Sequence, residues 1–312
     1  MLAYALRRLS AGVVTAAVVV TCIFFAMRVL PGDPAIAILG DYASQEAVEA
    51  LRENLNLNQP LWRQYLSFWI GVVQGDLGRS FSSRRPVASM IGQALPYTFS
   101  LIALGVLLGC LMGVPLGVLS AVKRNTWVDH LARVASLIGL SFPSFLFAIG
   151  LLYIFSLKLG LFPIMGGGDL SSVVDTLHHL FLPALGLGLM LAAFLSRATR
   201  SAMLEALGQD YMTTARSKGL AERVVVYKHA LRNALLPVAT FVGVYVGVLL
   251  AAGVISDVVF GRPGLGRLLA ESIRRRDYVV IQSGLMVLAV MVVATNLLTD
   301  LVYCVIDPRI RY

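Results

Sequence analysis

Long apolar blocks separated by charged segments dominate the hydrophobic pattern of this chain. A membrane-spanning helix needs about 20 consecutive apolar residues, and charge inside it is costly. Charge-free blocks that meet this requirement cover residues 9–27, 97–122, 134–157, 180–196, 234–256 and 278–299. The pattern therefore predicts an all-α polytopic membrane protein with six transmembrane helices.

The first block also has features of a secretory signal. Arg7 and Arg8 precede it, and Ala35-Ile-Ala37 is similar to a cleavage site. However, its apolar run is longer than the roughly 7–15 residues of a signal core. We interpret residues 1–30 as a short cytoplasmic stub followed by a retained first span.

The segment 31–96 is too long for a simple linker and has helical patterning. Ser44 is suited to cap a helix, and a second helical pattern begins at Leu61 with aromatic residues at Tyr65, Phe68 and Trp69. We predict an extracytoplasmic helical subdomain over 31–96. The alternative is an interfacial segment that lies on the lipid, which the aromatic residues would also suit.

Glycines at four-residue spacing mark two of the predicted spans. Small residues in one stripe let the backbone of a neighbouring helix approach closely. We therefore expect this pattern to serve helix packing rather than direct contact with a substrate. The glycines are Gly105, Gly109, Gly113 and Gly117 in the second span, and Gly243 and Gly247 in the fifth.

The segment 197–233 lies between the fourth and fifth spans and has more structure than a topology signal requires. Asp210 is suited to the N-cap of a short helix over 211–218, and Gly219 is suited to end that helix because glycine tolerates the left-handed conformation. A second helix, over 221–233, then leads to Pro237. This helix–stop–helix segment connects two spans of the membrane core 97–306. A short rigid unit of this kind is suited to transmit a movement to the spans on either side.

Composition and charge agree with a membrane protein. Of the 312 residues, 58% are hydrophobic and 14% charged, whereas soluble domains have roughly a quarter charged residues. With the amino terminus in the cytoplasm, basic residues outnumber acidic ones inside, and the outside is nearly balanced. Arg274-Arg275-Arg276 in the last outside loop departs from this bias. The net charge of +9 is dispersed among apolar blocks, which argues against nucleic-acid binding.

Signatures of catalysis and nucleotide binding do not stand out in the sequence. The stretch Gly261 to Arg267 is glycine-rich but lacks the Lys-Ser/Thr ending of a phosphate-binding loop, and we interpret it as a turn into a short helix over 268–273. The three cysteines lack metal-ligand spacing. Asp300 at the end of the sixth span is expected to pair locally, and no acidic or basic residue lies within the charge-free blocks.

The loop after the fourth span resembles the coupling loop of ABC importer permeases. The matching residues are Gln209-Asp-Tyr-Met-Thr-Thr-Ala-Arg-Ser-Lys-Gly219-Leu220 and His229-Ala-Leu-Arg-Asn-Ala-Leu-Leu-Pro237. The similarity is greatest to the first permease subunit of the dipeptide, oligopeptide and nickel branch. Further matching motifs are Leu30-Pro-Gly-Asp-Pro-Ala35, Ser141-Phe-Pro143, Pro263-Gly-Leu-Gly-Arg-Leu-Leu269 and Asp307-Pro-Arg-Ile-Arg311, and Ser83-Arg-Arg-Pro-Val-Ala88 is similar to glutathione importers.

This resemblance implies the type I ABC importer permease fold in a bacterial cytoplasmic membrane, with both termini, including the tail 307–312, in the cytoplasm. The implied partners are a second homologous permease, two ATPase subunits and an extracytoplasmic substrate-binding protein. ATP and Mg²⁺ would bind to the ATPase subunits, and this chain would hold no cofactor. The resemblance assigns ATPase coupling to Asp210, Thr213, Thr214, Ala215, Arg216, Lys218, Gly219 and Leu220. Candidates for the lining of the pathway are Ser141, Phe142, Pro143 and Asn296.

The substrate stays open among dipeptides, oligopeptides, glutathione, nickel and other small solutes. Alternatives of another class are a secondary transporter or channel, and a membrane-bound enzyme. The first would be favoured by ionisable groups inside the membrane, and the second by a convergent set of reactive side chains.

Overall fold

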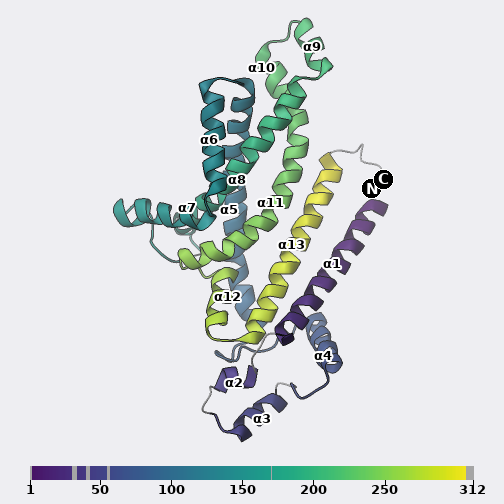
Figure 1. Ribbon diagram of the computed structural model, residues 1–312, viewed down its shortest axis with the longest axis vertical. Helices are drawn as coiled ribbons and strands as arrows, with labels where there is room; N and C mark the ends of the chain where they lie inside the picture. The colour runs from purple at the N-terminus through teal and green to yellow at the C-terminus, as the bar shows by residue number, and fades with distance from the viewer. Residues whose placement is uncertain (1, 30–33, 40–42, 55–56, 170, 307–312) are drawn as a thin grey trace.

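The computed structural model describes residues 2–29, 34–39, 43–54, 57–169 and 171–306, and its long elements are helices (Figure 1). The predicted tail 307–312 and residues 30–33 of the motif after the first span lie outside this part of the chain. The elements are α1 (Leu2–Val29), α2 (Pro34–Leu39), α3 (Gln45–Asn54), α4 (Leu61–Gln74), α5 (Val87–Val122), α6 (Trp127–Ser141), α7 (Ser144–Leu151), the π-helix η1 (Leu152–Lys158), α8 (Val173–Leu207), α9 (Asp210–Ser217), α10 (Glu222–Val224), the π-helix η2 (Val225–Ala230), α11 (Leu231–Val259), α12 (Leu265–Arg274) and α13 (Tyr278–Ile306).

Among the residues that the structure describes, five helical segments are long and apolar enough to cross a membrane, and they overlap five of the six predicted blocks. They are Leu6–Val29, Val87–Val122, Val173–Leu207, Glu222–Val259 and Tyr278–Leu301. The all-α membrane fold class is thereby confirmed.

The third block was predicted as one continuous span, and this is wrong. α6 ends at Ser141, and α7 begins at Ser144 after a bend of 100°. The proline ring of Pro143 has no N–H to continue the helix and forces the preceding residue towards an extended conformation. Phe142 accordingly has φ −94° and ψ 134°. α6 and α7–η1 together form a sixth, broken span or a re-entrant loop.

The second and fourth spans are longer than their charge-free blocks. α5 begins at Val87, so the last part of the predicted segment 31–96 belongs to this helix, and Pro96 lies inside it. α8 continues to Leu207 and therefore carries Arg197 and Arg200, which the sequence pattern assigns to a loop. The length of a charge-free block shows only how far the apolar part of a helix extends. Both helices continue past the ends of their blocks.

Close packing of α5 against α8 forms the centre of the bundle. A Cβ atom at Gly113 would lie 2.8 Å from Cα of Ala192, and one at Gly117 would lie 2.6 Å from the carbonyl oxygen of Ser196. Gly105 and Gly109 lie against Leu187 and Leu191 of α8, both buried. The four glycines therefore let the two backbones approach each other more closely than larger residues would.

The remaining predicted packing glycines face α13. A Cβ atom at Gly243 would overlap the side chain of Thr299, whereas one at Gly247 would be in ordinary contact with Val292 at 3.5 Å. At the end of α13, Asp300 pairs with Arg8 of α1 at 2.9 Å. Asp300 therefore pairs, as expected, but its partner lies on another helix that is distant in sequence rather than nearby in α13.

The short helices α2, α3 and α4 lie at one end of the molecule (Figure 1). Ser44 caps α3 by accepting a hydrogen bond from the backbone N–H of Ala47 at 3.2 Å. α4 packs on α1 through aromatic residues, with the rings of Tyr65 and Phe68 each 5.3 Å from that of Phe24. Its other face exposes apolar side chains, so the alternative of an interfacial helix stays open. These side chains are Leu61, Trp62, Leu66, Ile70 and Val73.

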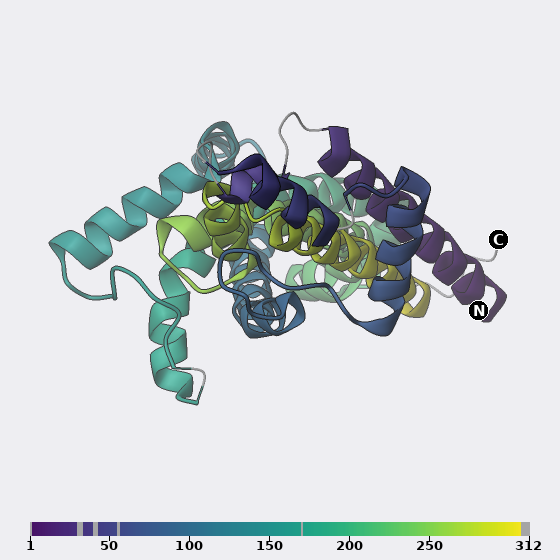
Figure 2. The ribbon, with the colours of Figure 1, turned by 90° about the horizontal axis from the view of Figure 1, so that it is seen from below.

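The two ends of the bundle carry different elements. α9 and α10 lie at one end of the long axis, and α2, α3 and α4 lie at the other (Figure 1). The start of α1 and the end of α13 lie side by side in the half nearer α9. Figure 2 shows that α7 and the start of α8 project from the side of the bundle.

The α5–α8 contact can be tested with two matched glycine substitutions. Gly113→Ala should destabilise the protein by about 1–3 kcal/mol through overpacking against the backbone of α8. Gly92→Ala, in the same helix, should be neutral or stabilising by up to about 1 kcal/mol, because nothing lies within 4 Å of its added Cβ. Thermal unfolding of the detergent-solubilised variants checks this. Equal midpoints would contradict the packing role.

Candidate functional site

α9 is a short helix with a glycine-dependent ending. Its N-cap is Gln209 and makes no side-chain capping bond, so the prediction that Asp210 is the N-cap is wrong by one position. Asp210 is instead the first helical residue, where its charge still favours the positive end of the helix dipole. At the other end Gly219 has φ +76°, as predicted for a left-handed stop.

The ending of α9 follows a Schellman motif. The N–H of Gly219 donates to the carbonyl of Arg216 at 2.9 Å, and the N–H of Leu220 donates to that of Ala215 at 3.4 Å. These bonds satisfy carbonyls that the helix end would otherwise leave unpaired. The direction in which the chain leaves α9 is therefore fixed by the conformation of one residue.

A small apolar core fixes α9 to the ends of α8 and α11. Met212 is fully buried and Ala215 is 8% exposed, and both pack in a cluster with Met203 of α8 and Val225 of η2. Ala215 is one of the residues to which the resemblance assigns ATPase coupling. The structure instead turns it towards the interior of its own chain, because Met212 and Ala215 share the face of α9 that meets this core.

The opposite face of α9 and its ending are exposed. Arg216, another residue of the predicted coupling set, makes a bidentate pair with Glu222, with bonds of 3.1 and 2.9 Å. The hydrogen bonds that Arg216 donates to the Glu222 carboxylate raise the pKa of the Arg216 guanidinium. Nothing lies within 4 Å of a Cβ built on Gly219. The exposed residues of the predicted coupling set are Asp210, Thr213, Thr214, Arg216, Lys218, Gly219 and Leu220.

A buried carboxylate joins α5, α6 and α8 near this end. Asp129 of α6 is fully buried and accepts bonds of 2.7 and 2.8 Å from Arg200 of α8. Ser120 of α5 donates to it at 2.5 Å, and the backbone N–H of Asn125 donates at 3.0 Å. A buried charge with this many donors is well compensated, and loss of one partner would be costly.

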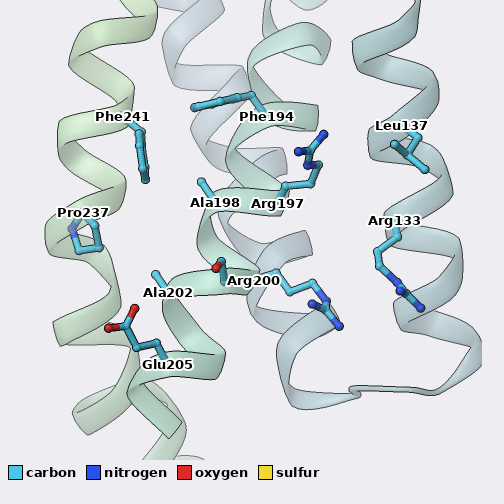
Figure 3. A pocket seen from close by; sticks show the side chains of 11 residues that line it. Arg133, Leu137, Phe194, Arg197, Ala198, Arg200, Ala202, Glu205, Pro237 and Phe241 are labelled. Carbon is cyan, nitrogen blue, oxygen red and sulfur yellow. The ribbon is translucent and has the colours of Figure 1, made fainter. Parts of the chain in front are cut away.

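Next to this cluster lies a cavity of about 670 Å³. Figure 3 shows that its walls come from three helices, α6, α8 and α11. Phe194 and Phe241 form one wall with their rings 5.7 Å apart in an edge-to-face arrangement. The lining residues are Arg133, Leu137, Phe194, Arg197, Ala198, Arg200, Ser201, Ala202, Glu205, Pro237 and Phe241.

Sequence reasoning missed this cavity because it ended the fourth span at Ser196. Met203 and Ala206 are buried and continue the helical spacing of α8 beyond the charge-free block. That periodicity was a signal that the helix continues. Because α8 continues to Leu207, Arg197 and Glu205 belong to this helix and line the cavity (Figure 3).

The predicted pathway residues lie in two places. Ser141, Phe142 and Pro143 form the exposed break between α6 and α7. Asn296 of α13 lines a separate cavity of about 430 Å³ between α11 and α13. The α6–α7 break and α13 lie on opposite sides of α11 in Figure 1, so these candidates do not form one site.

At the opposite end, the glycine-rich stretch forms a turn into α12, which begins earlier than predicted, at Leu265. Asp257 and Arg262 are buried there, with Nε of Arg262 3.7 Å from the carboxylate of Asp257. Arg262 also donates to the carbonyl of Tyr97 at 3.1 Å. The turn is thus held by contacts within the chain.

Known sequences and structures are similar to this chain over most of its length. The profile of the "binding-protein-dependent transport system inner membrane component" family matches residues 113–312, and the profile of the corresponding N-terminal region matches residues 1–102. A glutathione transport system permease protein, GsiC, of Escherichia coli is 40% identical over the full length of both chains. A dipeptide transport system permease protein, DppB, of Alkalihalophilus pseudofirmus is 38% identical, again over both full lengths.

Solved structures support the fold. A chain of the MetNI methionine ABC transporter in an inward-facing conformation has a TM-score of 0.58 at 17% identity, covering 70% of this chain and 96% of that one. A chain of an amino acid ABC transporter has a TM-score of 0.52 at 16% identity, covering 71% and 94%. The fold is therefore that of an ABC importer permease.

The conformation at Gly219 gives a testable prediction. Gly219→Ala places a side chain in the left-handed region and should cost about 1–2 kcal/mol locally. Gly208→Ala is the matched control, because Gly208 has φ −85° and accepts a side chain without strain. Hydrogen exchange at the amides of residues 219 and 220 should become about tenfold faster in the first variant only. Unchanged protection in Gly219→Ala would contradict the role of this conformation.

Proposed function

The chain belongs to the family of inner membrane components of binding-protein-dependent transport systems, and from this we propose that it is the permease subunit of an ABC importer for glutathione or dipeptides. It is a multi-pass membrane protein, and with a second homologous permease it forms the pathway. Two ATPase subunits drive uptake, and an extracytoplasmic substrate-binding protein delivers the substrate. ATP and Mg²⁺ bind to the ATPase subunits.

The observation that carries this proposal is the rigid attachment of α9. One face of this helix is buried between α8 and η2, and its other face is exposed and polar. A short helix held in this way transmits a displacement to the helices that hold it. We assign ATPase coupling to the exposed face of α9 and to its ending at Leu220, which is 40% exposed.

The orientation follows from the same assignment. If α9 faces the cytoplasm, both chain ends lie on the cytoplasmic side, because α1 begins and α13 ends in the half of the molecule nearer α9 (Figure 1). α2, α3 and α4 then face the outside, where they are available to the binding protein. The basic residues of 197–233 agree with this orientation.

The substrate class rests on the relatives. The names of two full-length relatives specify glutathione and dipeptide transport. Both substrates are small peptides with free carboxylate and ammonium groups. We therefore assign small peptides to this importer.

Uptake assays test the proposed function. The chain alone in liposomes should show no gradient-driven uptake of labelled dipeptide, glutathione or nickel. The complex with its partner permease, both ATPase subunits and the binding protein should take up a peptide when ATP is present. Substantial uptake by the chain alone would support a secondary transporter instead.

The assignment of α9 gives a second test. Leu220→Asp places a charge where an exposed apolar side chain would contact the ATPase, and should weaken assembly about tenfold or more. Tyr227→Asp is the control, because Tyr227 is exposed on η2, outside α9 and its ending. Co-purification of the ATPase subunits and stimulated ATP hydrolysis are the measurements. If Leu220→Asp assembles with the ATPase subunits as well as the wild type does, α9 and its ending are not part of the interface.

A further inference from the structure

The break between α6 and α7 lies at the middle depth of the apolar bundle. On the α6 side, a Cβ atom at Gly139 would lie 2.6 Å from Cβ of Ala193 in α8. On the α7 side, a Cβ atom at Gly186 of α8 would lie 3.6 Å from Cα of Ala148. The break falls between these two contacts, so it is level with the middle of the charge-free block 180–196.

The helical hydrogen bonding is interrupted at this depth. Pro143 has no N–H to donate, and within the described residues it precedes α7 without a side-chain capping bond. The last carbonyls of α6 and the first N–H groups of α7 therefore lose partners that a continuous helix would give them. Ser141, Phe142 and Pro143 are all exposed in this chain.

Lipid is a poor cover for this break. The hydrocarbon core of a bilayer offers no hydrogen bonds, so non-helical backbone at this depth occurs where protein covers it or where it lines a water-filled cavity. Within the described chain, α13 and α1 lie on the other side of α11 (Figure 1) and leave the break uncovered. The cover is therefore either water or a second protein.

The surface around the break is apolar, which favours protein over water. Polar and ionisable side chains inside a membrane commonly face water-filled cavities, whereas the core of a protein–protein interface is depleted of charge. The hydroxyl of Ser141 is already bonded to the carbonyl of Leu137 at 2.8 Å. The large side chains exposed beside the break are Leu137, Ile138, Phe142, Phe145 and Leu146, between 37% and 55% exposed.

We propose that a helix of the second homologous permease covers the α6–α7 break, and that the arm formed by α7, η1 and the start of α8 extends along that subunit. The arm projects from the side of the bundle (Figure 2) and exposes Tyr153, Ile154 and Leu157, each close to half exposed. Of the partners in the proposed function, on which this inference rests, the second permease is the one embedded in the bilayer. The covering helix is apolar and carries a polar side chain that bonds the free backbone groups.

Photocrosslinking tests the contact directly. Phe142 is replaced by p-benzoylphenylalanine, which keeps an aromatic side chain there, in the assembled complex of both permeases, the ATPase subunits and the binding protein. Illumination should attach the second permease, identified by mass spectrometry. The same replacement at Leu146, 44% exposed on α7, should give the same adduct. The control is the replacement of Val14, 62% exposed on the uninterrupted helix α1, which should give mainly lipid adducts.

Thiol labelling distinguishes a protein cover from water. Phe142→Cys and Ser83→Cys are compared in a chain whose Cys22, Cys110 and Cys304 are replaced by serine. Ser83 is exposed in the turn before α5. A small water-soluble maleimide should label Phe142→Cys at least about tenfold more slowly than Ser83→Cys, with and without ATP, because the well-packed core of an interface is shielded from solvent.

Three outcomes would overturn the contact. The first is that positions 142 and 146 give adducts with lipid alone. The second is capture of the second permease that is no more efficient from these positions than from Val14. The third is labelling of Phe142→Cys as fast as that of Ser83→Cys in either nucleotide state, because the break would then line a water-filled pathway.

The outcome is separable from that of the proposed function. A complex that takes up peptides with ATP but shows no capture from positions 142 and 146 overturns this contact and leaves the importer assignment intact. Capture of the second permease in a complex without ATP-driven uptake supports the contact and contradicts the importer assignment.

Discussion

The close contact between α5 and α8 is the constraint on which the functional parts of the molecule depend. Gly109 and Gly113 leave no room for a side chain between the two helices, so the rotation of α8 about its axis is fixed along its apolar length. With that rotation fixed, one face of α8 meets α5 and another presents Phe194, Arg197 and Glu205 to the cavity. The C-terminal end of the same helix leads to α9.

Buried carboxylates hold the two ends of this apolar bundle. Asp129 joins α5, α6 and α8 at the end near α9. At the other end Asp277, before α13, accepts hydrogen bonds from Ser80 at 2.6 Å and from the backbone of Ser82 at 3.1 Å. A buried carboxylate is stable only when its donors stay in place. These polar contacts therefore reinforce the register that the close packing of the helices sets.

Sequence patterns were sufficient for features that depend on local chemistry. Charge-free length located five spans, and Gly219 indicated the end of α9 because its conformation is a property of one residue. Features that depend on neighbours in space were not accessible. The 100° bend is different, because Pro143 is a local signal for it, but a criterion of charge-free length alone does not distinguish a broken helix from a continuous one. The inward direction of Ala215 is set by packing with Met203 and Val225, which belong to other helices.

The cavity and α9 share their supporting helices, and this relation has a mechanical consequence. Met212 and Ala215 of α9 are buried against the end of α8 on one side and against η2 on the other. α8 carries Arg197 into one wall of the cavity, and η2 continues into α11, which carries Pro237 and Phe241 into another. Because protein interiors are close-packed, a shift of α9 cannot be absorbed by empty space in this core. A displacement of α9 must therefore move the two cavity walls relative to α6, or break the core that holds α9.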